Sequence, residues 1–300
     1  MSAQANQARS KPETGTEAVL TVTGLRRSFG GVRAVDGVEF TIAPGEFVSI
    51  IGPNGSGKST TVNLISGVLK PDAGEVLVRG KRIRPGRPEA AAAAGIARTF
   101  QNGRVFGTMT VRENVDVGLQ TTLRATRPLR RLANIPVLKW VSLLAELGVA
   151  LAPTPAARAE RRESAARIDA QLDRFSERLV PRADHPTYTL SYANRRRTEI
   201  ARALASAPDL LLLDEPAAGM NQTETAEIGA QLAELKAQGQ TVLLVEHKMD
   251  LVHELSDRVL VLDEGRIIAS GTPDEVLSDP RVIEAYLGRS RAGGKVAVDV

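Results

Sequence analysis

Short apolar runs broken by glycine and aspartate open the chain and predict β structure. Between Ala18 and Val48 the segments VLTVTGL, VRAVDGVEFTI and FVSII combine β-branched residues with such breaks, which is typical of strands joined by tight turns. We interpret them as an antiparallel β lobe leading into a buried strand, Phe47 to Ile51. A glycine-rich turn follows at Gly52 to Gly57, and Ser59 to Leu69 has helical spacing. The predicted order is strand, glycine-rich turn, helix.

The middle of the chain has helical periodicity, and apolar strands follow it. From about Thr121 to Asp184 the sequence is rich in arginine and alanine, and apolar residues recur at Ile168, Leu172, Phe175 and Leu179. Two almost wholly apolar runs, Leu210 to Leu213 and Thr241 to Val245, flank an amphipathic stretch from Glu224 to Lys236. Such runs suit a buried parallel sheet. We therefore predict an α/β fold with a parallel sheet, an N-terminal antiparallel β lobe and an inserted helical subdomain at about residues 110–207.

Composition excludes several classes of protein. The net charge of +4 is milder than that of a typical nucleic-acid-binding protein. No cysteine is present, which excludes disulfides and thiolate metal sites. Residues 1–17 are polar and lack the apolar core of a signal peptide, so we expect a disordered cytosolic tail there and a second tail at 289–300. The stretch Ile135 to Pro153 is apolar but contains Lys139 and Glu146, so we expect no membrane span.

The glycine-rich turn satisfies the Walker A pattern, GPNGSGKST, in the required position between an apolar strand and a helix. Its glycines let successive backbone N–H groups face a phosphate, and the helix N-terminus adds partial positive charge. We expect Lys58 to bridge the β- and γ-phosphates and Ser59 to bind Mg²⁺. This indicates a P-loop NTPase core. The predicted ATP-binding residues of the loop are Gly52, Asn54, Gly55, Ser56, Gly57, Lys58, Ser59 and Thr60.

Two further strand ends carry candidate chemistry. The run LLLLDEP ends in two acids, of which Asp214 is expected to bind Mg²⁺ and Glu215 to polarise the attacking water. An Asp-Glu pair alone is often only solvated, and the Walker A loop is what favours the catalytic interpretation. His247 follows the run TVLLVE. Histidines are more often satisfied core residues, but parallel sheets bind ligands at the carboxyl ends of their strands, which favours a γ-phosphate contact.

Five segments in this order resemble the nucleotide-binding subunits of ABC transporters from about Val19 to Gly288: GPNGSGKST, TFQN, LSYANRRRTEIARAL, LLLLDEPAAGMNQ and LLVEHKM. The resemblance implies one nucleotide-binding domain over residues 18–288. It also implies roles for individual residues. Gln101 is the Q-loop glutamine, which senses Mg²⁺ and the membrane partner, and Phe29 stacks on adenine. Glu215 is the general base and His247 is the switch histidine. Ser191 and Ala193 lie in the signature motif.

In this family the signature motif completes the ATP site of the other subunit in a head-to-tail dimer. Here it reads LSYAN, whereas LSGGQ or LSYGQ is common, so Ala193 replaces a glycine. We expect its methyl group to crowd the partner's phosphate, with added strain if the backbone is left-handed there. The partner's site would then be slower, which favours a paralogous second ATPase subunit.

The resemblance also implies the other partners and the location. These are two integral membrane permease subunits and, for an importer, an extracytoplasmic solute-binding protein, with the chain at the cytoplasmic face of the membrane and no nucleic acid bound. The segments GIARTFQNGRVFGTMTVRENV, DEPAAGMNQ and VIEAYLG resemble the branched-chain amino-acid uptake subfamily. Import of urea or short amides and export of lipopolysaccharide remain alternatives.

Other functional classes fit the sequence less well. Soluble ABC ATPases that act on ribosomes or DNA usually carry two nucleotide domains or a long coiled-coil insert, and neither is seen here. A catalytically silent subunit is opposed by Glu215 and His247. The arginine-rich segment from Arg124 to Arg182, with an apolar patch around Trp140, is either a solvated helical face or a surface that docks the permease.

Overall fold

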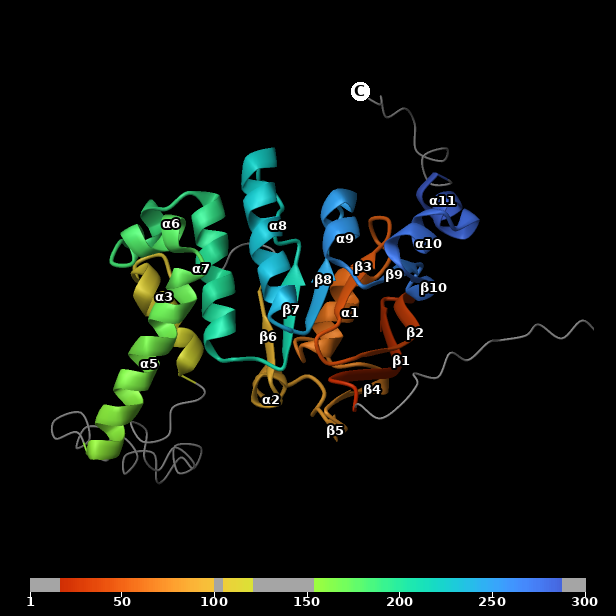
Figure 1. Cartoon of the computed structure of the whole chain (residues 1–300). Coiled ribbons are helices and arrows are strands. Elements are labelled where there is room, and N and C mark those ends of the chain that lie inside the picture. Colours follow the sequence, from red (N-terminus) through yellow and green to blue (C-terminus); the bar gives the residue numbers. More distant parts are fainter. Residues whose placement is uncertain (1–16, 100–104, 121–153, 288–300) are drawn as a thin grey trace, which may run out of the picture.

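The computed structural model describes residues 17–99, 105–120 and 154–287. Within these ranges the strands form a six-stranded sheet and a four-stranded sheet, with helices around them (Figure 1). The tails predicted at 1–17 and 289–300 lie outside the described residues, apart from Glu17. So do Gln101, the apolar stretch Ile135 to Pro153 and Trp140.

The four-stranded sheet confirms the antiparallel β lobe. Its order is β2-β1-β4-β5, with every neighbouring pair antiparallel. The strands are β1 (Leu20–Phe29), β2 (Val32–Ile42), β4 (Ala73–Val78) and β5 (Lys81–Arg82). β1 and β2 form a hairpin that turns at Gly30 and Gly31, both in the left-handed region. The two later strands, which follow the first helix in the chain, were not predicted from the sequence.

The six-stranded sheet has the order β10-β9-β3-β8-β7-β6. Its strands are β3 (Phe47–Ile51), β6 (Ile96–Arg98), β7 (Leu210–Asp214), β8 (Val242–Val245), β9 (Arg258–Asp263) and β10 (Arg266–Gly271). All neighbours run parallel except the edge strand β10. β3, β7 and β8 are buried along their whole length, which explains why they read as continuous apolar runs. The predicted parallel sheet is confirmed.

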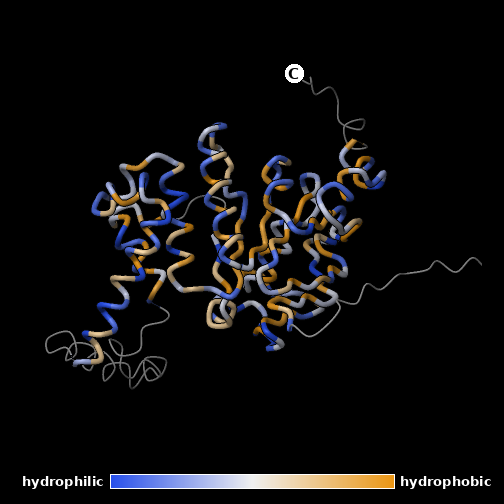
Figure 2. Tube along the Cα trace, viewed as in Figure 1, coloured by the Kyte–Doolittle hydropathy of each residue, from blue (hydrophilic) through white to orange (hydrophobic). Residues whose placement is uncertain are grey.

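Side chains alternate between the two faces of this sheet and build two large cores, and a smaller third core lies at β9 and β10. One core joins Phe47, Leu211 and Leu244 to α8 (Gln222–Ala237) and α9 (Met249–Leu255). The other joins Ile50, Leu212 and Val245 to α1 (Lys58–Ile65) and the β lobe. The sheet is therefore a middle layer, and apolar residues follow its strands through the centre of the molecule (Figure 2).

The helix after the glycine-rich turn is shorter than predicted. α1 ends at Ile65 rather than near Leu69. Gly67 follows with φ +72°, and a Cβ atom there would lie 2.8 Å from the backbone oxygen of Arg87. A left-handed residue packed against backbone ends the helix, so the apolar residues beyond it belong to a loop.

Helices between β6 and β7 stand beside the sheet (Figure 1). They are α3 (Val111–Leu119), α5 (Pro155–Asp173), α6 (Ser176–Leu179) and α7 (Tyr192–Ala205), with the short 3₁₀ turns η3 (Val180–Arg182) and η4 (Thr187–Thr189). Thr110 caps α3 in a reciprocal capping box with Glu113. Their apolar faces merge with the core on the α8 side of the sheet. The division of these helices into a separate subdomain stays a prediction.

The remaining short helices frame the sheet edges. α2 (Pro88–Ala93) precedes β6, while α10 (Pro273–Leu277) and α11 (Pro280–Leu287) follow β10. Among the helices in the described ranges, none combines the length and the apolarity that crossing a bilayer requires.

Candidate active site

Strand register brings the predicted chemistry to one edge of the parallel sheet. Ile50 of β3 pairs with Val245 of β8, which pairs with Asp214 of β7. The glycine-rich turn, the two acids and His247 each follow one of these strands. The three segments therefore leave the sheet at the same carboxyl edge, where open α/β folds bind their ligands.

The glycine-rich turn requires glycine at both of its ends. Gly52 has φ +148°, and a Cβ atom there would lie 2.1 Å from the Leu262 backbone oxygen. Gly57 has φ +103° and caps α1, and its Cβ atom would lie 2.3 Å from the Ala34 backbone oxygen. The neighbours are backbone atoms that cannot move aside as a side chain would. The loop is thus fixed as a bare backbone cradle at the N-terminus of α1, which suits phosphate binding.

Lys58 lies inside this loop and close to the two acids. Its Nζ donates to the backbone oxygens of Gly52, at 2.7 Å, and Pro53, at 3.0 Å. Burial lowers the pKa of Lys58, and the negative charges of Glu215 and Asp214 oppose that shift. One ammonium group and two carboxylates therefore share the site. Ser59, in the first turn of α1, is exposed.

The end of β7 is held from two sides. The Asp214 carboxylate accepts from Arg98 Nη2 at 3.0 Å, and both side chains are buried. Nη1 of Arg98 also donates to Asn63 Oδ1 at 2.6 Å and Ser66 Oγ at 2.8 Å, both near the end of α1. The backbone oxygen of Asp214 accepts from the buried Arg196 of α7. Neither arginine was predicted as a site residue, although Arg98 lies in GIARTFQNGRVFGTMTVRENV and Arg196 lies in LSYANRRRTEIARAL.

Glu215 has a backbone conformation that is rare for a residue other than glycine. Its φ is +47°, while its N–H donates to the Val245 backbone oxygen at 2.8 Å. A left-handed glutamate costs about 1–3 kcal/mol, and such strain tends to persist at functional positions. The turn gives Glu215 a direction different from that of Asp214, as the catalytic interpretation requires.

His247 is not a core histidine. Its side chain is 60% exposed, and Nδ1 lies 3.3 Å from Oε2 of Glu246, whose side chain is fully buried. Glu246 is a third residue of the site that was not predicted from the sequence. Its position at the end of an apolar strand was the available signal, because a carboxylate there needs several donors if it is buried.

The remaining candidates lie on other elements. Phe29 at the end of β1 is 43% exposed, with the Arg27 guanidinium 4.8 Å from its ring centre. Ser191 caps α7 and accepts from the Asn194 N–H at 3.3 Å. Ala193 corrects an expectation. It lies within α7, outside the left-handed region, and its side chain is buried in the helical core. Ala193 therefore adds no left-handed backbone strain, and its methyl group does not point toward the partner's phosphate.

Comparison with known proteins identifies the family. Residues 35–218 match the profile of the family described as "ABC transporter". The chain belongs to the ABC transporter family. Residues 266–292 match a second profile, described as "Branched-chain amino acid ATP-binding cassette transporter", which spans β10, α10 and α11.

Relatives of the ABC transporter family agree over nearly the whole chain. The high-affinity branched-chain amino acid transport ATP-binding protein LivG of Escherichia coli K12 is 37% identical over 276 residues, which are 92% of this chain and 100% of LivG. A solved ABC transporter cassette in its ADP conformation is 33% identical with a TM-score of 0.72, covering 91% of this chain and 100% of that one. A dimeric cassette bound to ADP and Pi is 25% identical with a TM-score of 0.62, covering 85% and 98%.

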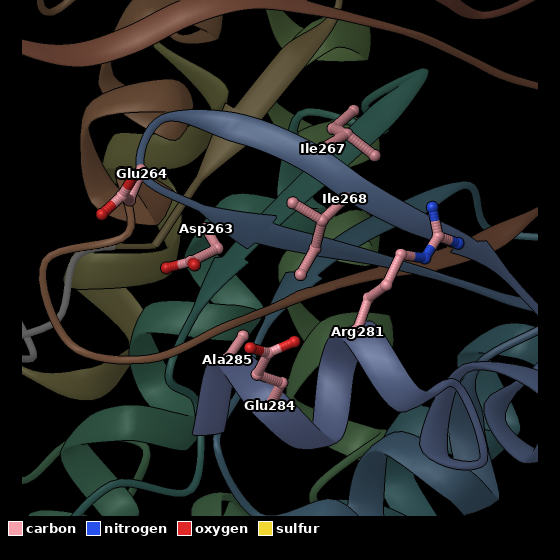
Figure 3. Close-up of a pocket in the computed structure, with 7 residues that line it drawn as sticks. All are labelled: Asp263, Glu264, Ile267, Ile268, Arg281, Glu284 and Ala285. Atoms are coloured by element: carbon pink, nitrogen blue, oxygen red, sulfur yellow. The ribbon is translucent and has the colours of Figure 1, made fainter. Parts of the chain in front are cut away.

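The C-terminal part of the ABC chain borders the Walker A loop. A pocket of about 600 Å³ opens between the β9–β10 turn and α11, with Asp263, Glu264 and Glu284 facing it (Figure 3). Arg281 also lines the pocket and is paired with Asp279 at 2.6 Å. Burial raises the pKa of Tyr286 of α11, and the nearby backbone of Gly52 opposes that shift. The pocket contains none of the residues predicted for catalysis.

Proposed function

We propose that the chain is the ATP-hydrolysing subunit of an ABC importer for branched-chain or related amino acids. The observation that carries the ATPase assignment is the shared register of β3, β8 and β7, which gathers Lys58, Asp214, Glu215 and His247 at one sheet edge. The solute is supported by the LivG relative and by the match of residues 266–292.

The residues present fit ATP. The glycine cradle and the N-terminus of α1 offer N–H groups to the phosphates, and Lys58 exchanges the oxygens of Gly52 and Pro53 for the β- and γ-phosphates. The exposed ring of Phe29 stacks on adenine. His247, exposed at the end of β8, contacts the γ-phosphate.

Hydrolysis needs a water molecule in line with the γ-phosphate. Glu215 orients and polarises this water and accepts its proton. The hydroxyl of Ser59 and the carboxylate of Asp214 offer oxygen donors that suit Mg²⁺. Gln101, which lies outside the described residues, is the third ligand that we propose. When bound, Mg²⁺ neutralises charge on the phosphates.

Further subunits complete the transporter that we propose. A second ATPase subunit packs head to tail, so that Ser191 and the N-terminus of α7 face its ATP, as the dimeric cassette among the similar structures supports. Two integral membrane permease subunits bind at the cytoplasmic face, and an extracytoplasmic solute-binding protein delivers the solute. An exposed apolar surface formed by Phe106, Met109 and Tyr188 is the docking site that we propose for a permease.

Replacing Glu215 by glutamine tests the ATPase assignment. Because the amide cannot accept a proton, Glu215→Gln should reduce ATP turnover at least a hundredfold while ATP still binds. Steady-state phosphate release and equilibrium nucleotide binding measure the two effects. The control Glu39→Gln changes an exposed acid on β2 and should retain full turnover. Normal turnover in Glu215→Gln would remove the residue from catalysis.

Uptake into proteoliposomes that contain the assembled transporter tests the solute. Radiolabelled leucine should enter with ATP inside, and excess unlabelled isoleucine or valine should compete. Competition by urea or acetamide, with none by the amino acids, would assign the chain to amide import instead. ATP turnover stimulated by lipopolysaccharide would assign it to export.

A further inference from the structure

We propose that Glu246 is the positioning residue of the switch loop, which fixes the ring of His247 in one tautomer and ties that loop to the segment after Glu215. The inference rests on the proposed role of His247 at the γ-phosphate. The side chain of Glu246 is fully buried at the end of β8, whereas that of the next residue, His247, is 60% exposed. One residue thus faces the protein and the other faces the nucleotide.

The contacts of the Glu246 carboxylate join two loops. Oε2 accepts from the backbone N–H of His247 at 2.8 Å, lies 3.3 Å from the Nδ1 of the same residue, and has a longer contact with the Lys248 N–H at 3.5 Å. Oε1 accepts from the backbone N–H of Ala217 at 3.3 Å. Ala217 lies two residues after Glu215. A buried carboxylate that gathers donors from both segments is stabilised as an anion and holds the segments together.

Lys248 adds a second tie between the same loops. Its Nζ donates to the Met220 backbone oxygen at 3.3 Å and to Thr225 Oγ1 at 2.6 Å. The N–H of Glu215 donates in turn to the oxygen of Val245, directly before Glu246. The proposed general base and the proposed γ-phosphate contact are therefore fastened to each other by three independent links.

The same geometry determines which ring nitrogen of His247 faces the nucleotide. An ionised carboxylate only accepts hydrogen bonds, so the Glu246 carboxylate 3.3 Å from Nδ1 favours the tautomer that carries the proton on Nδ1. In the neutral ring Nε2 is then unprotonated and remains for the ligand. At His253 the other ring nitrogen lies beside a carboxylate, because Nε2 is 2.9 Å from Asp274 Oδ1. We expect the Nδ1–H tautomer at His247 and the Nε2–H tautomer at His253.

Nitrogen NMR of the full-length chain labelled with ¹⁵N-histidine tests this without any catalytic readout. The sequence contains only three histidines, and His247→Gln and His253→Gln assign their signals. At about pH 9, well above the ordinary histidine pKa of about 6.5, the pyrrole-type signal of His247 should belong to Nδ1. An Nε2–H ring, or an even mixture, would overturn the proposal while leaving the ATPase assignment intact.

Glu246→Gln tests the positioning role. The amide presents a donor where the carboxylate accepted, so the His247 signals should change tautomer or average, and turnover should fall about ten- to hundredfold. Nucleotide affinity should stay within about twofold, because Lys58 and the cradle are untouched. The matched control Asp274→Asn should change the signals of His253 alone and leave turnover normal. Unchanged His247 signals or full turnover in Glu246→Gln would contradict the proposal.

Discussion

Lys58 is the one cation of the loop GPNGSGKST, in which we propose that the phosphates of ATP bind. Its Nζ is bound by two backbone oxygens of its own loop, and burial lowers its pKa while two carboxylates support its charge. An ammonium group that is partly desolvated interacts more strongly with a polyphosphate than one in water, because the effective dielectric constant is lower.

Removing this cation should weaken ATP binding itself. We expect Lys58→Ala to raise the dissociation constant of ATP at least tenfold, because no other described cation lies in the loop to neutralise the β- and γ-phosphates. Titration calorimetry measures the effect. Lys70→Ala, which changes an exposed lysine after α1, is the control and should bind normally. An unchanged affinity in Lys58→Ala would contradict the phosphate role.

At the scale of elements, the end of β7 is where several parts of the molecule meet. Arg98 connects β6 and α1 to the Asp214 carboxylate, and Arg196 connects α7 to the backbone of the same residue. β7 and β8 are joined further by their ladder and by the contact between Glu246 and Ala217. A movement of the helices beside the sheet would therefore displace the residues that we propose to hold the metal ion and the attacking water.

The contribution of the Arg98–Asp214 ion pair to the free energy of unfolding can be measured. Both side chains are less than a tenth exposed, so Arg98→Ala leaves a buried carboxylate without this partner and should lower the free energy of unfolding by about 3 kcal/mol. Chemical denaturation provides the value. The control Arg112→Ala breaks an exposed pair with Asp169 and should cost less than about 1 kcal/mol. Equal losses of unfolding free energy in Arg98→Ala and Arg112→Ala would show that burial of the Arg98–Asp214 pair does not add to stability.

At the scale of the whole molecule, we propose that the signature segment completes the ATP site of a second subunit. Its sequence, LSYAN, suggested a slow site in the partner, but Ala193 lies in regular helix with its methyl group in the core. The substitution of glycine by alanine is therefore accommodated by packing inside this chain. An asymmetric pair of ATP sites does not follow from Ala193.

Restoring glycine should accordingly bring no gain. Ala193→Gly adds backbone freedom to a helix and removes a buried methyl group, so it should destabilise the chain by about 1–2 kcal/mol. In the assembled transporter, with Glu215→Gln silencing this chain's own site, the partner's turnover should stay the same or fall. Thermal unfolding and phosphate release measure the two effects. Faster turnover in Ala193→Gly would restore the crowding hypothesis.

The sequence by itself determined the features that are written in contiguous residues. Two features depend on local backbone geometry and on the local hydrophobic pattern: the strand, glycine-rich turn and helix around Lys58, and the acids Asp214 and Glu215 at the end of an apolar run. Fully buried strands read as unbroken apolar runs, so the parallel sheet was also predictable. These features need no knowledge of what packs against them.

Only the tertiary structure decided which distant polar groups meet. Arg98 and Asp214 are 116 positions apart, and Glu246 reaches Ala217 across 29. Periodicity along a chain says which face of an element is buried, but it does not say which buried charge will face which. A buried arginine or glutamate is stable only when packing supplies its partners, so its role is set by the fold. The burial of Ala193 and the left-handed backbone of Glu215 arise in the same way, from neighbours that the sequence places far away.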